Sequence, residues 1–289
     1  MYHEPIFTIF GKGVYLYGVF IGIGLLACIG VLYYYTKKKN MPSYVQDFVF
    51  VSAIVAVALG FLCAKVWQAF YDWLATGEFD FYGAGITVMG GLVGGALAFV
   101  ATYFIGGHFF FRGKRKGIHI REFNKIVLVA PICISIAHAF GRLGCLMAGC
   151  CHGTYLGDSP VAGGIKMMGT IEVGNVTVKH LGYYIPTQLY EALFLFALFG
   201  VLSLMYFKGS NLTMHVYLFA YGVWRMFIEI FRGDYRGGAE SAALSPSQWM
   251  SIAFILGAIA LFVIYKLLKL PMKVDYSKQE KTKIVKNKD

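Results

Sequence analysis

Seven apolar runs of about twenty residues each constrain this chain more than any other feature of its sequence. They lie near 14–36, 48–71, 88–106, 126–147, 187–207, 213–231 and 248–270. A helix of about 20 apolar residues is long enough to cross a hydrocarbon core of about 30 Å. Glycines interrupt the third run, and small residues at that spacing favour close helix packing within a bundle. The sequence therefore predicts an all-α integral membrane protein with seven transmembrane helices.

The composition excludes an ordinary soluble domain. Of the 289 residues, 58% are hydrophobic and only 14% are charged, whereas soluble domains carry about 25% charged residues. The mean hydropathy is +0.62. We expect one seven-helix membrane domain over 1–270 and a basic tail over 271–289. Between the fourth and fifth runs, apolar and polar residues alternate in "VAGGIKMMGTIEVGNVTVKHLGYY", which predicts a small hairpin or cap.

The positions of Lys and Arg predict the orientation of the helices. Of the 26 basic residues, 18 fall in loops on one side of the predicted membrane and five on the other. Cytoplasmic loops carry the excess of Lys and Arg, so we expect the N-terminus outside, the C-terminus in the cytoplasm and the cap on the external face. The same bias explains the net charge of +11 without a nucleic-acid partner, because cytoplasmic lysines can lie against anionic lipid.

Charged side chains inside the apolar runs indicate where function lies, since an arginine at the centre of a membrane helix costs about 2.5–3.5 kcal/mol. In "HAFGRLGCLMAGCCHG", His138, Arg142 and Cys145 stand at i, i+4 and i+7 and share one helix face. We expect this face to line a cavity, and "GRLG" and "AGCCHG" to break the helix near the external surface. Alternatively, Arg142 extends to the lipid headgroups while His138 caps backbone carbonyls.

A second charged segment lies in the sixth run, "YGVWRMFIEIFRGD", where four polar side chains form one stripe. These are Tyr221, Arg225, Glu229 and Arg232. Arg225 and Glu229 are spaced to pair, and a purely structural buried ion pair is the alternative interpretation. Two arginines and one glutamate leave a positive excess, which suits a phosphate because arginine can bind its oxygens in bidentate fashion.

The third polar segment is "IPTQLYEALFLF", which places Gln188 and Glu191 one turn apart in the fifth run. An interfacial belt of aromatic and polar residues is the favoured interpretation there, and it also suits Tyr15 and Tyr17 in the first run. Even so, two arginines on different helices, with polar groups toward the outer leaflet, predict a site for an anionic lipid headgroup.

The cysteines fall into two groups. Three lie within apolar runs, where a buried thiol behaves as a small hydrophobe: Cys28, Cys63 and Cys133. The other three, Cys145, Cys150 and Cys151, leave three interpretations open. Zinc is bound by thiolates and imidazole, but C-x4-C-C-H lacks the usual C-x2-C spacing. The second interpretation is a disulfide from Cys145 to Cys150 or Cys151. The third, which we favour, is small polar packing at the mouth of the cavity. We therefore predict no metal site, and no cofactor motif is present.

The motifs resemble the phosphatidylglycerol–prolipoprotein diacylglyceryl transferases of bacterial inner membranes. The likeness lies in "YLYGVFIGIG", "GITVMGGLVGG", "GRLGCLMAGCCHG", "PTQLYEAL", "YGVWRMFIEIFR" and "LSPSQWMSI", in the order of that family. The resemblance implies a multi-pass enzyme of the inner membrane. Its substrates would be phosphatidylglycerol and the signal peptide of a lipoprotein precursor. The diacylglyceryl group would pass to the lipobox cysteine thiol, forming a thioether and releasing glycerol phosphate.

The resemblance also implies roles for individual residues. Arg142 falls on the signature arginine of the family, Arg225 on the essential arginine of the sixth span, and Tyr17, Tyr221 and Glu229 on positions that the family uses. Arginines aimed at the phosphate would stabilise the charge that develops on the leaving group. The expected catalytic residues are Arg142, Arg225, His138 and Tyr221. The expected substrate-binding residues are Arg142, Arg225, Tyr17, Gln188, Glu191, Glu229 and Arg232.

The sequence departs from the family pattern at three positions. Met89 stands where a histidine usually precedes "GGL", Cys145 replaces an asparagine and Cys150 replaces an acidic residue. A thiol of pKa about 8.5 needs a base or a positive field to ionise, and we expect His138 or His152 to act as the base. Two other functions stay open: a paralogue that serves a different acceptor, and a non-catalytic protein that binds an anionic lipid.

Overall fold

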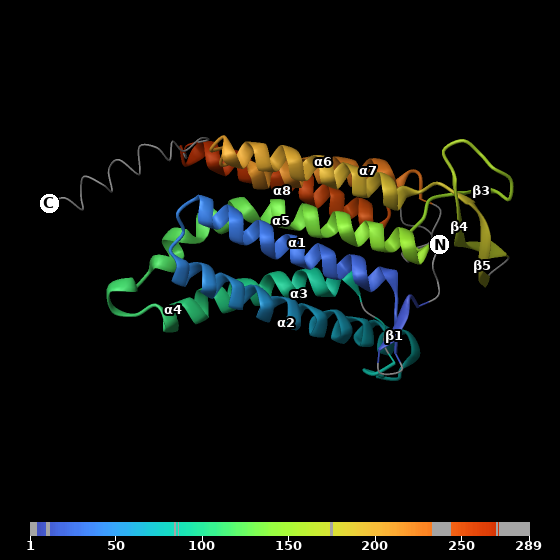
Figure 1. Ribbon diagram of the computed structural model, residues 1–289, viewed down its shortest axis with the longest axis horizontal. Coiled ribbons are helices and arrows are strands. Elements are labelled where there is room, and N and C mark those ends of the chain that lie inside the picture. The colour runs from blue at the N-terminus through green and yellow to red at the C-terminus, as the bar shows by residue number, and fades with distance from the viewer. Residues whose placement is uncertain are drawn as a thin grey trace. The chain divides into compact units, whose positions relative to one another are not determined.

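The computed structural model describes residues 5–9, 12–83, 85, 87–173, 176–232, 244–269 and 271. Nearly all of the predicted basic tail lies outside these residues, so the tail stays a prediction. The chain divides into two compact units, one formed by Met1–Leu32 with Val127–Asp289 and the other by Tyr33–Ile126. Figure 1 shows the elements of both units along the chain.

The fold is mostly helical, as predicted. Within the described residues, six helical segments are long and apolar enough to cross a membrane: Leu16–Lys38, Ser43–Leu74, Gly90–Phe110, Ile118–Ala148, Thr187–Phe207 and Ser247–Leu267. The sixth predicted run forms α7 (Thr213–Glu229), which has only 17 residues and is shorter than these six. The structure thus confirms six of the seven predicted spans by length, and the count of seven stays a prediction.

The unit Tyr33–Ile126 contains a close helix pair. Helix α2 (Ser43–Thr76) is followed by α3 (Val88–Ala101), the π-helical turn η1 (Thr102–Gly106), α4 (Gly107–Phe110) and the 3-10 turn η2 (Gly113–Arg115). A Cβ atom on Gly60 of α2 would lie 3.1 Å from the carbonyl oxygen of Gly91 and 3.2 Å from Cα of Gly95 on α3. Glycines therefore bring the two backbones together, which confirms the packing predicted for the third run.

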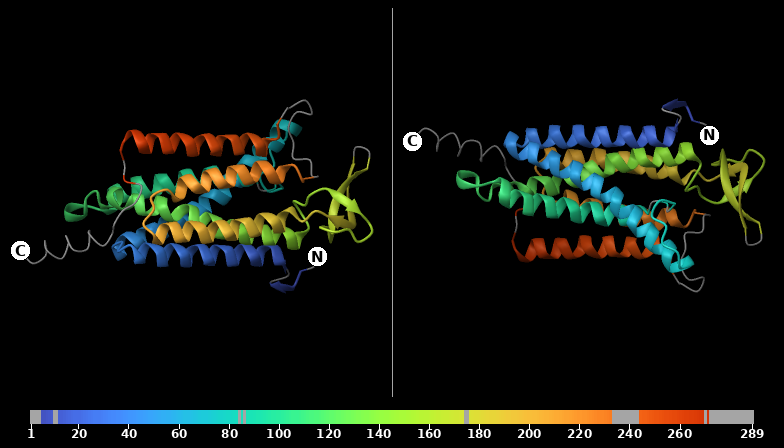
Figure 2. Two further views of the ribbon diagram at one scale, coloured as in Figure 1. Left: turned by 90° about the horizontal axis from the view of Figure 1, so that it is seen from above. Right: turned by 90° about the horizontal axis from the view of Figure 1, so that it is seen from below.

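The other unit contains most of α1 (Leu16–Lys38) and α5 (Ile118–Ala148), together with α6 (Thr187–Phe207), α7 and α8 (Pro246–Leu267). Figure 2 shows these helices from two further sides. The prediction that "GRLG" breaks the helix is wrong, because α5 continues through it to Ala148. Gly144 serves packing instead: a Cβ there would lie 3.2 Å from the backbone oxygen of Tyr17 on α1. The helix ends where Gly149 adopts a left-handed φ of 69°.

A small antiparallel sheet follows α5, as the sequence predicts. Its strands β3 (Tyr155–Gly157), β4 (Ile165–Val173) and β5 (Val176–Tyr184) lie in the order β3-β5-β4. Leu146, Met167 and Tyr184 form a buried cluster between the sheet and the end of α5. The sheet lies beyond the ends of α5, α6 and α7 (Figure 1). A separate hairpin of β1 (Phe7–Ile9) and β2 (Lys12–Val14) precedes α1.

Candidate functional site

The carboxylate of Glu191 is the centre of a buried polar cluster near the sheet-side ends of the helices. Glu191 lies in the second turn of α6, and its side chain is fully buried. Its Oε2 atom lies 3.0 Å from Nε of Arg142 on α5 and 3.5 Å from Nη1 of Arg225 on α7. One carboxylate therefore joins arginines from two other helices.

The second oxygen of Glu191 faces an aromatic pair. The hydroxyl of Tyr221 donates to Glu191 Oε1 at 3.1 Å, and Nε2 of His138 lies 3.8 Å from the same oxygen. The rings of His138 and Tyr221 meet edge to face, with centroids 5.4 Å apart. Arg142 Nε–H also donates to His138 Nε2 at 3.3 Å, so the proton of a neutral imidazole lies on Nδ1. The structure thus confirms that His138 and Arg142 share one helix face.

A second carboxylate, that of Glu229, extends the cluster. Its Oε2 atom lies 3.1 Å from Nη2 of Arg225, which confirms the predicted pair, and 3.9 Å from Nε of Arg232. Ser245 Oγ donates to Glu229 Oε1 at 3.0 Å, and Ser247 Oγ accepts from Arg225 Nη2 at 2.9 Å. Ser245 also caps α8 and forms a capping box with Gln248, so the start of α8 is fixed against the site.

Arginines outnumber carboxylates in the ion pairs that the described residues form. Three guanidinium groups, those of Arg142, Arg225 and Arg232, face the two carboxylates of Glu191 and Glu229 in the described ion pairs. The Arg225 and Arg232 side chains are each only 3% exposed. Arginine binds phosphate oxygens through bidentate contacts, so a cluster of guanidinium groups of this kind suits an anionic ligand.

The loop after α5 is fastened to the same helices. The backbone oxygen of Cys150 accepts from Gln188 Nε2 at 2.7 Å. The backbone oxygen of Cys151 accepts from Thr187 Oγ1 at 3.0 Å and from Arg232 Nη2 at 3.4 Å. The loop is therefore held on the first turn of α6, and Glu191 lies in the next turn of the same helix.

His152 has a structural role. Its Nε2 atom accepts from the backbone N–H of Thr170 on β4 at 2.9 Å, which leaves Nδ1 as the donor to the carbonyl oxygen of Gly153 at 2.9 Å. The side chain is 2% exposed. One ring nitrogen therefore binds the sheet and the other binds the loop backbone, so both nitrogens of His152 are engaged in structural contacts.

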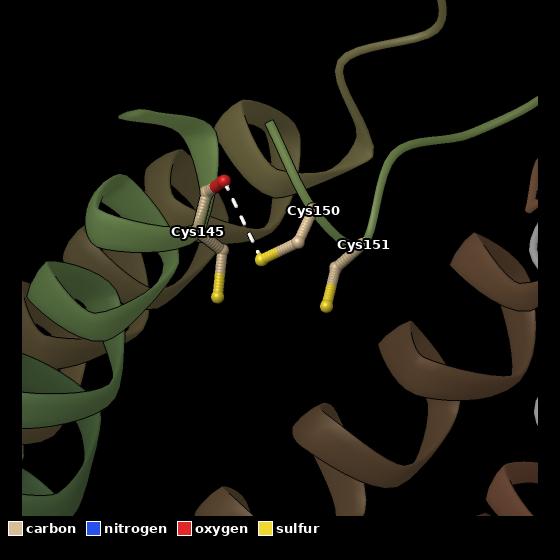
Figure 3. Close-up of side chains that lie close together, drawn as sticks. All are labelled: Cys145, Cys150 and Cys151. Atoms are coloured by element: carbon tan, nitrogen blue, oxygen red, sulfur yellow. Dashed lines mark hydrogen bonds between the residues drawn. The ribbon is translucent and has the colours of Figure 1, made fainter. Parts of the chain in front are cut away.

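Three cysteine side chains gather at the end of α5. The Sγ atoms of Cys145, Cys150 and Cys151 all lie within 4.8 Å of one another, and Cys150 Sγ lies 3.7 Å from the backbone oxygen of Cys145 (Figure 3). All six cysteines of the chain lie within the described residues, and no disulfide joins any two of them. The disulfide weighed from the sequence is therefore not formed in this structure.

The interfacial belt predicted for the start of the fifth run is wrong for two of its residues. Gln188 and Glu191 are both fully buried. The belt suits Tyr190 and Tyr17 better, which are 37% and 42% exposed. The one sequence signal for the role of Glu191 is its position as a carboxylate in an otherwise apolar run, since such groups usually face the bundle interior.

Met89 lies at the start of α3 in the other compact unit.

Comparison with known proteins gives one consistent result. The sequence model of the prolipoprotein diacylglyceryl transferase family matches residues 5–264. A phosphatidylglycerol–prolipoprotein diacylglyceryl transferase 2 of Clostridium perfringens is 31% identical over 267 residues, covering 90% of this chain and 94% of that protein. The phosphatidylglycerol–prolipoprotein diacylglyceryl transferase of Clostridium tetani is 30% identical, covering 90% and 96%. That of Clostridioides difficile is 27% identical, covering 88% and 90%.

Proposed function

Because the chain belongs to the prolipoprotein diacylglyceryl transferase family, we propose that the cluster around Glu191 is its phosphatidylglycerol site. The protein is a multi-pass membrane transferase of lipoprotein biosynthesis, and it transfers the diacylglyceryl group of phosphatidylglycerol to prolipoprotein. One observation carries the assignment of the site: Arg142 and Arg225 come from different helices and converge on a single buried carboxylate, at 3.0 and 3.5 Å.

The reaction forms one bond and breaks one. The sulfur of the lipobox cysteine attacks a glycerol carbon of the lipid, a C–S bond forms, and the bond between that carbon and the phosphate oxygen breaks. Negative charge develops on the phosphate oxygens, and pre-aimed donors stabilise such charge in a water-poor site. Arg142 and Arg225 are the donors that we assign to this role, and Glu191 holds both guanidinium groups in place before the lipid arrives.

Two further groups act on protons in this proposal. His138 Nε2 is an acceptor, because Arg142 donates to it, and we assign it to take the proton of the attacking thiol. Glu191 Oε1, 3.8 Å from the same nitrogen, stabilises the imidazolium that results. Tyr221 donates to Glu191 Oε1 and fixes the orientation of the carboxylate. A general base of this kind contributes about 10²–10⁴-fold to the rate.

The remaining predicted contacts lie around this centre. Glu229 and Arg232 complete the ion-pair network with Arg225, while Gln188 holds the loop at Cys150. We assign Tyr17, which packs beside Gly144 of α5, to the lipid near its headgroup. These residues position the lipid or the arginines rather than react.

The membrane arrangement follows from the basic residues of the sequence. We propose seven spans in the bacterial inner membrane, including the short α7, with the N-terminus outside and the C-terminus in the cytoplasm. The sheet after α5 then lies on the external face, where the signal peptide of a translocated precursor presents its cysteine. Support comes from the bias of Lys and Arg toward the loops that this topology places in the cytoplasm.

A transfer assay tests the function directly. Protein purified in detergent receives phosphatidylglycerol and a synthetic lipobox peptide, and mass spectrometry measures the thioether product. We expect product from the intact protein, none from Arg142→Ala, and none with a peptide whose cysteine is replaced by serine. Bound lipid without product would instead identify a non-catalytic binding protein. Product on another thiol alone would identify a paralogue with a different acceptor.

A further inference from the structure

The three cysteines at the end of α5 have no part in the transfer chemistry described so far. Their Sγ atoms all lie within 4.8 Å of one another, although they come from two differently structured segments. Cys145 belongs to the last turn of α5, while Cys150 and Cys151 belong to the loop that follows. Figure 3 shows the three sulfurs gathered on one side of that loop.

The backbone of the loop holds this arrangement. Gly149 turns the chain out of the helix with φ 69°, and the N–H of Cys150 donates back to the carbonyl oxygen of Cys145 at 3.2 Å. Cys151 has φ 61°, a left-handed conformation that is uncommon for residues other than glycine. Thr187 and Arg232 hold its carbonyl oxygen. The fold therefore gathers the sulfurs despite a C-x4-C-C spacing that does not resemble a metal motif.

The geometry fits a thiophilic ion. Zinc binds thiolates at about 2.3 Å, which places the sulfurs of a tetrahedral site about 3.8 Å apart, so rotation about the Cα–Cβ bonds closes the observed triangle onto an ion. Among the residues that the structure describes, no fourth His, Cys, Asp or Glu joins the group. His152, the nearest imidazole in sequence, is committed to Gly153 and Thr170. Three protein ligands with one open position are typical of catalytic rather than structural zinc sites.

We propose that Cys145, Cys150 and Cys151 bind a thiophilic divalent ion such as zinc, and that the open position receives the thiol of the incoming prolipoprotein. This inference rests on the proposed function and names how that function obtains its nucleophile. A bound ion holds a thiol ligand as the thiolate, which is the reactive form. Such an ion supplies the positive field that an acceptor thiol needs to ionise.

The step balances without an oxidant or a reductant. On binding, the acceptor thiol gives its proton to His138, the proton acceptor proposed above. The metal-held sulfur then forms its bond to the glycerol carbon as the C–O bond breaks, and the glycerol phosphate leaves onto the arginines and takes the proton from His138. Arg142 precedes Cys145 by one helical turn, so the leaving group and the nucleophile meet on one face of α5. The product is a neutral thioether, a weaker ligand than a thiolate, so it leaves and the ion stays unchanged.

Cobalt binding tests this site independently of catalysis. Protein in detergent is stripped with a chelator and titrated with Co²⁺, whose absorption reports thiolate ligation and tetrahedral geometry. We expect one equivalent to give thiolate-to-cobalt charge-transfer absorption that one equivalent of Zn²⁺ removes. Cys145→Ser, Cys150→Ser and Cys151→Ser should each weaken cobalt binding at least tenfold. The matched control is Cys63→Ser on α2, which should bind cobalt as the unaltered protein does.

The open position has its own test. A lipobox peptide with cysteine should change the cobalt absorption, and the same peptide with serine should not. An unchanged spectrum with both peptides would overturn the inference about the open position, and absence of thiolate-to-cobalt absorption in the unaltered protein would overturn the site itself. So would a native disulfide between any two of the three cysteines, detected by mass spectrometry.

Transfer activity separates this inference from the function on which it rests. We expect the stripped protein to lose transfer and to regain it with Zn²⁺. Full transfer by the stripped protein would overturn the metal inference and leave the proposed function intact. Tight cobalt binding without transfer under any metal loading would contradict the proposed function while supporting the three-cysteine site.

Discussion

Arg142 Nε lies 3.0 Å from Glu191 Oε2, and this contact links the signature arginine of α5 to a carboxylate on α6 that is fully buried. The contact explains how a guanidinium group is kept inside an apolar bundle before substrate binds. Arg225 on α7 approaches the same oxygen of Glu191 at 3.5 Å. Both guanidinium groups therefore meet one oxygen of the same carboxylate.

Replacement of the central carboxylate should lower both the stability and the activity of the protein. Glu191→Gln keeps the shape but removes the counter-charge of two buried arginines, and loss of one partner from a buried pair costs about 3–5 kcal/mol. We expect a lower unfolding temperature in detergent and a fall in kcat of at least about 100-fold, because the two arginine donors lose the carboxylate that aligns them. The exposed Glu78 offers a matched control, because Glu78→Gln should change neither. Wild-type kcat in Glu191→Gln would show that the carboxylate does not align the arginines.

The helices could be predicted from the sequence because each is a long apolar run with polar flanks. The run 187–207 coincides with α6 (Thr187–Phe207), which lies between Pro186 and Lys208. The helix ends were harder to predict from polarity. Helix α2 extends over 34 residues, well past the predicted 48–71, because a helix continues into polar residues wherever its backbone hydrogen bonds are kept. The break expected at "GRLG" failed for a similar reason, since glycine permits close packing as well as turns.

The sequence predicts the contacts within one helix of the site but not the contacts between helices. Spacing along one helix reveals neighbours such as Arg225 and Glu229, which are four residues apart. It does not reveal which face of another helix a residue meets, so the segment around Glu191 favours an interfacial belt even though Glu191 is also an expected substrate-binding residue. The cysteine cluster was hidden for a different reason, because the left-handed φ of Cys151 sets the direction of the loop and no spacing rule contains that angle.

The geometry of the guanidinium group, and not only its charge, should matter at Arg225. Arg225→Lys keeps the positive charge but cannot contact Glu191, Glu229 and Ser247 together, as the planar guanidinium does. We expect kcat/KM to fall by about 10²–10³-fold, measured with varied phosphatidylglycerol in mixed micelles. The exposed Arg112 provides the same substitution away from the site, and Arg112→Lys should retain the wild-type value. Equal kcat/KM for both variants would contradict phosphate binding at Arg225.

Loss of the Tyr221 hydroxyl, which donates to the Glu191 carboxylate, should lower the transfer rate moderately. Tyr221→Phe removes the donor to Glu191 Oε1, and a hydrogen bond to a charged group contributes about 1.5–3 kcal/mol. We expect the transfer rate to fall by about 10-fold or more and the unfolding temperature to fall with it. Tyr190→Phe on α6 removes a hydroxyl that binds the backbone of Gly163 in an exposed position and should transfer normally. A larger loss in Tyr190→Phe than in Tyr221→Phe would contradict the placement of the site.

The sheet after α5 should weaken in acid. Hydrogen bonds from His180 first and then Tyr155 lower the pKa of the exposed Asp158 carboxyl. A depressed carboxyl pKa stabilises the fold above the unfolded-state pKa, and this contribution is lost as the pH falls through the folded value. Hydrogen-exchange protection of β5, corrected for the intrinsic rate, should therefore drop below about pH 4. Asp158→Asn should remove that component of the pH dependence; an unchanged pH profile in this variant would show that another group is responsible.

The two histidines of the signature segment should respond in opposite ways to the same substitution. His138→Gln removes the nitrogen that faces Glu191 Oε1 and accepts from Arg142, so we expect kcat to fall by about 10²–10⁴-fold with modest loss of stability. His152→Gln disturbs the contacts to Thr170 and Gly153, and an unsatisfied buried donor costs about 1–3 kcal/mol. This variant should unfold at a lower temperature and keep its kcat when assayed well below that temperature. Reversal of the two outcomes would transfer the proton-accepting role to His152.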